Sequence, residues 1–470
     1  MNPVTQLRKC YREIIAALPF YDAWRRDESY KNEFGLPEKN RFPAPDNSVF
    51  SLYMPKENTL DEHFKKCAAS GVIPAVRHDQ ITHEDLIDAL RKNPDVKVIL
   101  GSGEKKVLYF IEELCNMLEE FPNLYLSTAN LCNYRTFPDM VPQKLYKQLL
   151  WGTLAPLLDP HAAAGQLALA PISWEDKCAI AGNNLRKLLN MPLAPIPEEV
   201  KIEGVKPFII DAHGHCSFSR STNRMPTADL KFKDVNDWHN ALNDSFVDRF
   251  WMIPSVCNRD ARNTASEIIA DFLKNSDRIN YMETYSPETS QECIEKLQKV
   301  LPDPRCVGIK IHPPAHKVDA ADPRYAPVWD IAEKFGKPIM SHTWAVVDHN
   351  PFQSYSTPAR FVCHLEKHPN VVFVLGHAGG RPGSIDELFD VCTRFPNTYV
   401  DLAGDYFHAG VLDKIVQCPG VDRIIFASDA NWIDPSHVLG MLLASDLSDD
   451  DLYKILVTNA EKVYCKHLNK

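Results

Sequence analysis

The stretch Phe208-Ile-Ile-Asp-Ala-His-Gly-His215 decides the fold, because an apolar run ends in two histidines separated by one residue. In an extended backbone, residues two apart point to the same side, so the imidazoles of His213 and His215 are expected to converge where the strand stops. Such a pair can share one metal ion, although an isolated His-x-His is more often solvated. The residues downstream must decide between these interpretations.

From residue 208 onward, eight short apolar runs alternate with stretches of helical period. The predicted strands are Phe208–Asp211, Phe250–Val256, Ile279–Glu283, Val307–Ile311, Pro338–Ser341, Val371–Leu375, Thr398–Leu402 and Arg423–Ala427. The predicted helices are Ala261–Asn275, Thr289–Val300, Ala326–Phe335, Thr357–Lys367 and Ser384–Phe395. This α/β pattern predicts a closed (β/α)8 barrel of the TIM type. The alternative is a doubly wound open sheet, but its usual Gly-rich turn after the first strand is missing.

The region before the barrel is predicted to be a degenerate partial repeat of the same fold. Asn93–Gly101 resembles His368–Gly376 at an offset of 275 residues, and Asn184 matches Asn459 at the same offset. One offset held over such a length indicates duplicated structure. We therefore divide the chain into a non-catalytic repeat at 1–203, which matches barrel units four to eight, and a barrel at 204–470.

An open parallel sheet of this kind must have its edges and apolar face covered. The repeat is therefore expected to pack on the barrel, on another subunit or under a helix at Gln6–Ala17. The Pro-rich passage Met191–Pro197 is the predicted linker between the two units.

Ligand-type side chains lie at the carboxyl ends of several predicted strands, where enzymes with this fold keep their active sites. Lys310 and His312 end the fourth strand and His342 the fifth, while His377 follows the sixth and Asp429 the eighth. Each alone has a structural explanation, such as a helix N-cap for Asp429. Together these explanations require five coincidences, so we predict a metal site at the barrel mouth. Weaker candidates at the rim are Arg259, Glu283, Trp344, Arg381 and Asn431.

From Phe208 to about Leu468 the chain resembles the amidohydrolase superfamily, and more narrowly its branch with aminocarboxymuconate-semialdehyde decarboxylase and related aromatic-acid decarboxylases. The motifs that carry the resemblance are Asp211-Ala-His-Gly-His215, Gly308-Ile-Lys-Ile-His-Pro313, Ser341-His342, Gly376-His-Ala-Gly-Gly380, Ser428-Asp429 and Thr458-Asn-Ala460. The resemblance implies one divalent metal, commonly zinc, held by four of these residues: His213, His215, His342 and Asp429. It makes His377 a second ligand or a metal-adjacent acid or base.

Imidazole and carboxylate ligands suit Zn²⁺, and a catalytic zinc lowers the pKa of bound water towards about 7. Asp429 is predicted to take the proton of that water and pass it to a leaving group, and His377 to stabilise negative charge. Lys310, the third predicted catalytic residue, leaves two alternatives. It is either carboxylated and bridges two metal ions, or it is an ammonium that binds a substrate carboxylate, which we favour.

These residues predict a metal-dependent hydrolase of the amidohydrolase type, acting on a C–N or C–O bond of a small carboxylated molecule. The alternatives are a decarboxylase or hydratase that uses the same ligands, and a non-enzymatic metal-binding protein. The repeat cannot hold the metal, because positions matching Lys310, His312, His377 and Asp429 carry other residues. They are Leu52, Met54, Ser102 and Leu154.

The composition narrows the class of partner. Net charge is −10 without a cluster of Lys and Arg, which gives no support for binding nucleic acid or an anionic membrane. The expected partner is a small molecule, and a homo-oligomer is an open alternative. Thirteen cysteines, an odd number, argue against a disulfide framework. With no segment resembling a signal peptide or a membrane span, we expect a cytoplasmic protein.

Overall fold

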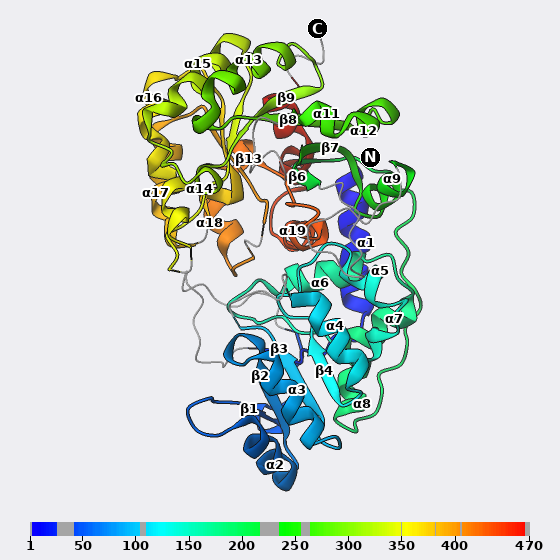
Figure 1. The fold of residues 1–470 in the computed structure, drawn as a ribbon. Helices are drawn as coiled ribbons and strands as arrows, with labels where there is room; N and C mark the ends of the chain where they lie inside the picture. The colour runs from blue at the N-terminus through cyan, green and yellow to red at the C-terminus, as the bar shows by residue number, and fades with distance from the viewer. Residues whose placement is uncertain are drawn as a thin grey trace.

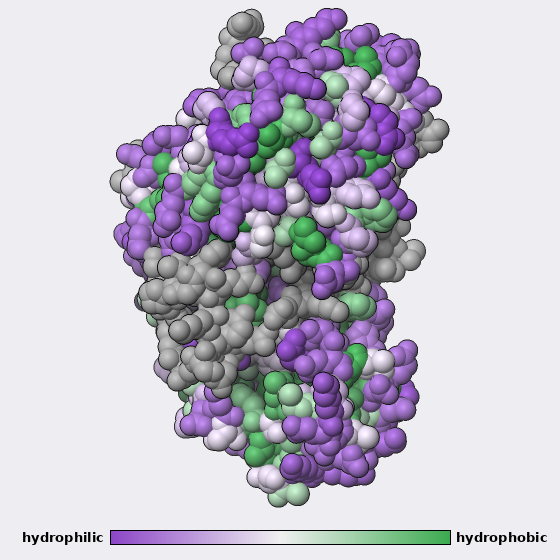
Figure 2. All heavy atoms as spheres, turned by 90° about the vertical axis from the view of Figure 1, so that its left-hand side faces the viewer, coloured by the Kyte–Doolittle hydropathy of each residue, from purple (hydrophilic) through white to green (hydrophobic). Residues whose placement is uncertain are grey.

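The computed structural model describes residues 2–25, 42–103, 110–216, 235–254, 264–348, 350–380, 382–404 and 407–465. Figure 1 shows two α/β units, an N-terminal half up to residue 190 and a barrel from residue 209 onward, with helices between them. The face drawn in Figure 2 is mainly hydrophilic, with hydrophobic residues scattered over it. In the described ranges, no helix is both long and apolar enough to cross a membrane.

The barrel is a sheet of eight parallel strands that follow one another in sequence order. They are β6 (Ile209–Cys216), β7 (Val247–Pro254), β8 (Ile279–Thr284), β9 (Cys306–Ile311), β10 (Ile339–Ser341), β11 (Phe373–Leu375), β12 (Thr398–Asp401) and β13 (Ile424–Ile425). Hydrogen bonds join the first strand to the chain after the last, from Ala212 N to Phe426 O (3.2 Å) and from Asp429 N to His213 O (2.9 Å). These bonds bring the two ends of the sheet together, so the predicted (β/α)8 barrel is confirmed.

All eight predicted strands are present, but β6 is longer than predicted. His213 and His215 therefore lie inside the strand rather than beyond its end. The register against β7 shifts between Asp211 and Gly214. A Cβ at Gly214 would lie 1.8 Å from the Phe250 ring, so the residue between the two histidines must be glycine.

Helices surround the barrel strands as the helical periods predict (Figure 1). The predicted helix at Ala326–Phe335 has those bounds, and it ends because Gly336 adopts a left-handed conformation with φ +63°. The predicted Ala261–Asn275 begins outside the described residues and breaks into two at Ile269. The described helices are α9 (Val235–Asp244), α11 (Ala265–Ile268), α12 (Ala270–Asn275), α13 (Ser290–Val300), α14 (Pro313–His316), α15 (Ala326–Phe335), α16 (Val362–Lys367), α17 (Ile385–Arg394), α18 (Val411–Gln417), α19 (Pro435–Ala444), α20 (Asp449–Tyr453) and α21 (Asn459–Tyr464).

The N-terminal half contains a five-stranded parallel sheet, again in sequence order. Its strands are β1 (Phe50–Leu52), β2 (Ile73–Arg77), β3 (Val98–Gly101), β4 (Leu124–Ser127) and β5 (Leu149–Leu150). Its helices are α1 (Pro3–Ala17), α2 (Leu60–Ser70), α3 (His83–Lys92), α4 (Ile111–Glu120), α5 (Thr136–Met140), α6 (Pro160–Leu169), α7 (Trp174–Cys178) and α8 (Asn184–Leu188). Five strands are the number that a match to barrel units four to eight requires.

The two halves share local structure at the 275-residue offset. Asp159 caps α6 and Asp434 caps α19, each followed by proline at the first helical position. The side-chain amide of Asn184 donates to Tyr146 O (2.7 Å) and Leu149 O (2.9 Å). The amide of Asn459 donates to the matching acceptors, Val421 O (2.7 Å) and Ile424 O (2.7 Å).

A short segment before β1 also has a counterpart in the barrel, at an offset of 189 residues. Asp22-Ala23-Trp24 lies where Asp211-Ala212-His213 lies in the barrel: Ala23 N donates to Trp151 O (2.8 Å), as Ala212 N donates to Phe426 O. Asp22 accepts from Thr153 N (3.2 Å), as Asp211 accepts from Ser428 N (3.0 Å). This segment thus makes the hydrogen bonds that the end of β6 makes in the barrel.

The N-terminal half packs on the barrel, which is one of the three arrangements that the sequence left open. Helix α1 begins three residues before the predicted Gln6 and contacts both α6 and α19. Its Arg8 guanidinium donates to Leu443 O (3.1 Å) and Leu447 O (2.6 Å) and pairs with Asp449 (3.0 Å). One large hydrophobic cluster includes residues of both halves, and a smaller second cluster lies within the N-terminal half.

Candidate metal centre

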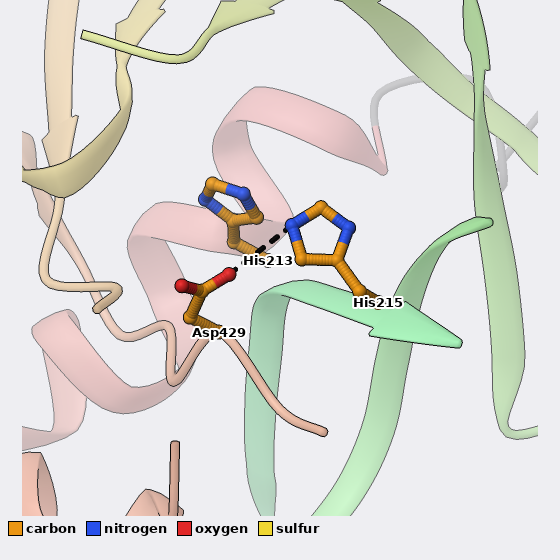
Figure 3. A group of neighbouring side chains, drawn as sticks. All are labelled: His213, His215 and Asp429. Carbon is orange, nitrogen blue, oxygen red and sulfur yellow. Dashed lines mark ion pairs between the residues drawn. The ribbon is translucent and has the colours of Figure 1, made fainter. Parts of the chain in front are cut away.

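Three predicted ligands lie together at the barrel mouth. The candidate ligand atoms of His213, His215 and Asp429 all lie within 4.8 Å of one another. Figure 3 shows the two imidazoles of β6 and the carboxylate that follows β13 facing one another, with His215 Nε2 3.1 Å from Asp429 Oδ1. Two imidazoles and one carboxylate fit a divalent transition metal, so the structure brings together the ligands of a candidate metal centre.

The hydrogen bonds of His213 and His215 use Nδ1 of each ring and leave Nε2 available to bind a metal. His213 Nδ1 lies 2.9 Å from Asp401 Oδ2, and His215 Nδ1 donates to Ile253 O at 3.0 Å. With the proton on Nδ1, the lone pair of a neutral imidazole is on Nε2. Burial lowers the pKa of His213, and the nearby charge of Lys310 lowers it further. Both rings are therefore oriented as metal ligands.

Asp401 is a site residue that was not predicted from the sequence. It ends β12 and is fully buried. Its Oδ2 faces His213, while its Oδ1 accepts from His377 N (2.8 Å) and Ala403 N (3.1 Å). The rule that found the other residues, a polar side chain at the carboxyl end of a strand, applies equally to Asp401. One carboxylate thus fixes the ring of one predicted ligand and the backbone of another.

The backbone around Asp429 is fixed from both sides. Asp429 has a left-handed conformation, φ +69°, and its N–H donates to His213 O. The preceding Ser428 donates its N–H to Asp211 Oδ1 at 3.0 Å. Burial raises the pKa of Asp211 to about 7, against the effect of its hydrogen bonds with Ser428. These bonds hold the chain after β13 against β6, which sets the distance between Asp429 and the two histidines.

Lys310 is the penultimate residue of β9, and its side chain reaches the candidate ligands. Its side chain is buried, with Nζ 2.8 Å from His213 Nε2. Burial lowers the pKa of Lys310 to about 8, while the charges of Asp401 and Asp429 act in the opposite direction. A pKa of about 8 leaves most of the amine protonated at neutral pH. The Lys310 amine thus lies against the nitrogen of His213 that is the candidate metal ligand.

His342 and His377 line the same mouth but are not part of the three-residue group. The ring of His377 lies 5.0 Å from that of His213 and 4.6 Å from that of His342, between centroids. His377 Nδ1 donates to Ala403 O (3.2 Å), and His342 Nε2 donates to Gln353 Oε1 (2.9 Å). Burial is the main cause that lowers the pKa of both, to about 3 for His342. Both rings are neutral and each keeps one acceptor nitrogen.

The rim beside these histidines is aromatic. The ring of His342 is stacked with that of His312 at 4.2 Å and with that of Trp344 at 5.7 Å, between centroids. His312 Nδ1 also accepts from Ala315 N (3.2 Å) as the N-cap of α14. Stacked rings on one wall of the mouth suit a planar substrate.

The other rim candidates divide into three groups. Glu283 is structural, since it is buried and pairs with Lys296 Nζ at 3.1 Å. Asn431 is buried, and within the described residues neither atom of its side-chain amide has a hydrogen-bond partner. Arg259 and Arg381 lie outside the described residues. Of these candidates, Asn431 has unused capacity for hydrogen bonds close to the metal ligands.

Comparison with known protein families identifies the family to which the barrel belongs. The family model for amidohydrolases matches residues 210–465, more than half of the chain. The chain belongs to the amidohydrolase family. The resemblance seen in the sequence motifs is therefore confirmed, and this amidohydrolase's donor set and family together support a divalent metal ion.

This amidohydrolase resembles decarboxylases. It is 21% identical over 249 residues, 43% of this chain and 75% of the relative, to γ-resorcylate decarboxylase of Rhizobium sp. (strain MTP-10005). Among solved structures, 2,6-dihydroxybenzoate decarboxylase from Rhizobium is 16% identical, with 54% of this chain and 98% of that one covered and a TM-score of 0.44. A dihydroxybenzoic acid decarboxylase from Polaromonas sp. JS666, with bound manganese and the inhibitor 2-nitroresorcinol, is 14% identical, with 56% and 97% covered and a TM-score of 0.42.

A cavity of about 260 Å³ opens in the N-terminal half, at the carboxyl ends of its strands. It is lined by Trp24, Leu52, Ser102 and Leu154, which match the positions of His213, Lys310, His377 and Asp429. Arg77 also lines it and pairs with Asp79 at 2.9 Å. At the four matched positions the cavity has no metal-ligand side chain.

Proposed function

We propose that this amidohydrolase is a metal-dependent decarboxylase of a small carboxylated aromatic compound. The observation that carries the proposal is the cluster of His213, His215 and Asp429 beside the buried ammonium of Lys310. The similarity to γ-resorcylate decarboxylase favours carbon–carbon cleavage over the hydrolysis predicted from the sequence. The aromatic group of His312, His342 and Trp344 beside these residues suits an aromatic substrate.

The proposed site holds one divalent ion through His213, His215 and Asp429, with His377 and His342 at its side. When bound, the ion polarises an oxygen of the substrate as a Lewis acid. The ligand types predict zinc, and metal analysis of the purified protein distinguishes it from manganese. We propose one ion per chain, with Lys310 as an ammonium rather than as a carboxylated bridge.

The proposed role of Lys310 follows from how negative charge is redistributed on the substrate during decarboxylation. Decarboxylation removes charge from the carboxylate as CO2 forms and places it on the ring. An ammonium on the departing carboxylate would stabilise the ground state more than the transition state, which would slow the reaction. We therefore place Lys310 against a substrate oxygen that keeps or gains negative charge, such as a ring hydroxyl next to the reacting carbon.

Asp429 is the proposed proton donor. It presents Oδ1 to His215, and its second oxygen is the one that would carry the proton. As the bond between ring and carboxylate breaks, the electron pair stays on the ring carbon and takes this proton, so that an aryl carboxylate and a proton become an arene and CO2. The amide of Asn431, two residues further on, is placed to hold a polar group of the substrate.

The test is product analysis on metal-loaded protein. Purified chain, reconstituted with Zn²⁺ or Mn²⁺, is incubated with 2,6-dihydroxybenzoate and other carboxylated phenols, and CO2 and the free phenol are measured. We expect both in equal amounts, and neither from protein treated with a chelator. Absence of CO2, together with cleavage of carboxylated lactones or amides, would restore hydrolysis as the function.

A further inference from the structure

The two halves of the chain meet at matching residues. Helix α6 packs on α19, and Gly165 and Gly440 hold the same place in the two helices. A Cβ on Gly165 would lie 2.5 Å from Gly440 Cα, and a Cβ on Gly440 would lie 2.6 Å from Gly165 Cα. At either position a side chain would clash with the backbone of the other glycine, so both positions require glycine. A contact of one position with its own counterpart lies on a two-fold axis.

Backbone hydrogen bonds between the halves obey the same symmetry. They form two pairs. Within each pair, the second bond joins the residues that correspond, at the offset of 275, to those of the first bond, with the two halves exchanged. The first pair is Asp434 N to Cys132 O (3.0 Å) with Asp159 N to Phe407 O (2.7 Å), and the second is Tyr134 N to Trp432 O (3.2 Å) with Ala409 N to Leu157 O (3.0 Å). The antiparallel bridges between Asn133 and Ile433 and between Leu158 and His408 are related in the same way.

Reciprocal contacts of this kind define an isologous interface, which two identical subunits make around a two-fold axis. Here both sides belong to one chain. We propose that the N-terminal half is a built-in second subunit: a non-catalytic partial copy that occupies the partner's place and holds the catalytic segment Asp429–Asp434 in position.

The N-terminal half holds that segment directly. Trp432 O accepts from Tyr134 N, and Asp434 Oδ2 accepts from Arg135 N at 3.1 Å. Inside the segment, Trp432 N and Ile433 N donate to Asp429 O at 2.9 and 3.2 Å. A movement of the N-terminal half is therefore passed to the Asp429 backbone through two or three residues. This makes Tyr134 and Arg135 positioning groups, which act on Asp429 through Trp432 and Asp434.

The side chains around Arg135 add a second connection. Its guanidinium pairs with Asp244 at the end of α9 at 3.2 Å. Burial raises the pKa of Asp244, while its bond to Arg135 acts in the opposite direction. Arg135 thus links two barrel elements, α9 and the cap of α19, to the N-terminal half.

The first experiment cuts the chain and leaves the interface in place. A recognition sequence for a specific protease is inserted between Glu203 and Gly204, both exposed, and the purified full-length protein is cleaved. We expect the two pieces to elute together, with unchanged hydrogen exchange of amides 432–434 and unchanged Mn²⁺ affinity. Separation of the pieces on dilution, with exchange and affinity unaffected, would overturn the proposal.

The second experiment opens the interface on its axis. Gly165→Ala forces the two helices apart, because the atom that the new Cβ meets belongs to the backbone. We expect faster exchange at amides 432–434 and a fall in Mn²⁺ affinity of about tenfold, the effect usual for loss of support behind metal ligands. Should this variant not fold, cleaved wild-type protein decides the question.

Gly71→Ala is the matched control. Gly71 ends α2 with φ +69°, and a Cβ added there would meet no atom within 4 Å, so the change strains the backbone without reaching the interface. It should leave exchange at 432–434 and Mn²⁺ affinity as in wild type. The same change in both glycine variants, or none at Gly165→Ala, would show that the N-terminal half does not position Asp429. These readouts need no turnover, so they stand apart from the proposed decarboxylation.

Discussion

Asp401→Asn tests whether the site depends on the orientation of one imidazole. Oδ1 of Asp401 accepts two backbone N–H groups, from His377 and Ala403, and Oδ2 faces Nδ1 of His213. In the variant, the amide oxygen stays with the two N–H donors, because turning it away would leave both unsatisfied at about 1–3 kcal/mol each. The amide NH2 is then placed against His213 Nδ1.

An NH2 group only donates, so His213 must accept at Nδ1 and carry its proton on Nε2. That nitrogen then has no lone pair for a metal, and it also faces the donor Nζ of Lys310. Loss of such supporting bonds weakens metal binding about 10- to 100-fold, which corresponds to about 1.4–2.8 kcal/mol. We expect this loss in calorimetric titrations of metal-free Asp401→Asn with Zn²⁺ and Mn²⁺.

Glu283→Gln is the control for this experiment. Glu283 is also a buried carboxylate near the carboxyl end of a barrel strand, but it bonds to Lys296 and to the backbone N–H groups of Ala265 and Thr284. The control is expected to lower the unfolding temperature and keep wild-type metal affinity. Unchanged affinity in Asp401→Asn, or an equal loss in both variants, would refute the assignment of His213 Nε2 as a ligand.

Three further changes test single roles. Asp429→Asn should abolish CO2 release and leave the unfolding temperature almost unchanged; retained turnover would remove Asp429 from proton transfer. Lys310→Met should lower kcat/KM for carboxylated phenols about tenfold with metal content unchanged, whereas loss of metal would indicate a carboxylated, bridging lysine. Burial raises the pKa of Asp22 to about 7 from 3.8. Between these two pH values the folded protein therefore keeps a proton on Asp22 that the unfolded chain releases. Wild-type unfolding free energy should therefore fall with rising pH by about 1.4 kcal/mol per unit relative to Asp22→Asn, and parallel pH curves from denaturant titrations would contradict this.

Strand positions could be predicted because apolar runs and helical periods depend only on local sequence. The predicted Ala326–Phe335 helix and the strand ending at Ile311 agree with the structure. The predicted end of β6 at Asp211 was wrong, since the residues from Ala212 to Cys216 look like a loop until their pairing with β7 is known. Ala212 and His215 also donate their N–H groups to the carbonyls of Phe426 and Ala430. Tertiary pairing, which the local pattern does not contain, decided that boundary.

The candidate ligands could be predicted because they follow strands in the order that the fold requires. The residues that orient them could not all be predicted. Gln353 reaches His342 from the turn at Pro351–Ser356, and the path of that turn depends on packing. Asp401 could have been found by its place at a strand end, but a single acid in an apolar run has no spacing pattern to mark it.

The N-terminal half also shows which features of the site belong to the fold alone. Leu154 has φ +59° where Asp429 has φ +69°, and its N–H donates to Trp24 O at 2.8 Å, as that of Asp429 donates to His213 O. A left-handed leucine costs about 1–2 kcal/mol, and it is kept here without any metal ligand to position. The strained backbone at Asp429 is therefore no sign of catalysis.

The same comparison applies to the buried acids. Burial raises the pKa of both Asp22 and Asp211 to about 7, and each accepts hydrogen bonds from the residue before the left-handed position. Asp22 does this in a half where, among the described residues, no group of three candidate metal ligands is found, so a raised pKa does not make Asp211 a catalytic acid. Function must then depend on the side chains that differ between matching positions: His213 against Trp24, Lys310 against Leu52, His377 against Ser102 and Asp429 against Leu154.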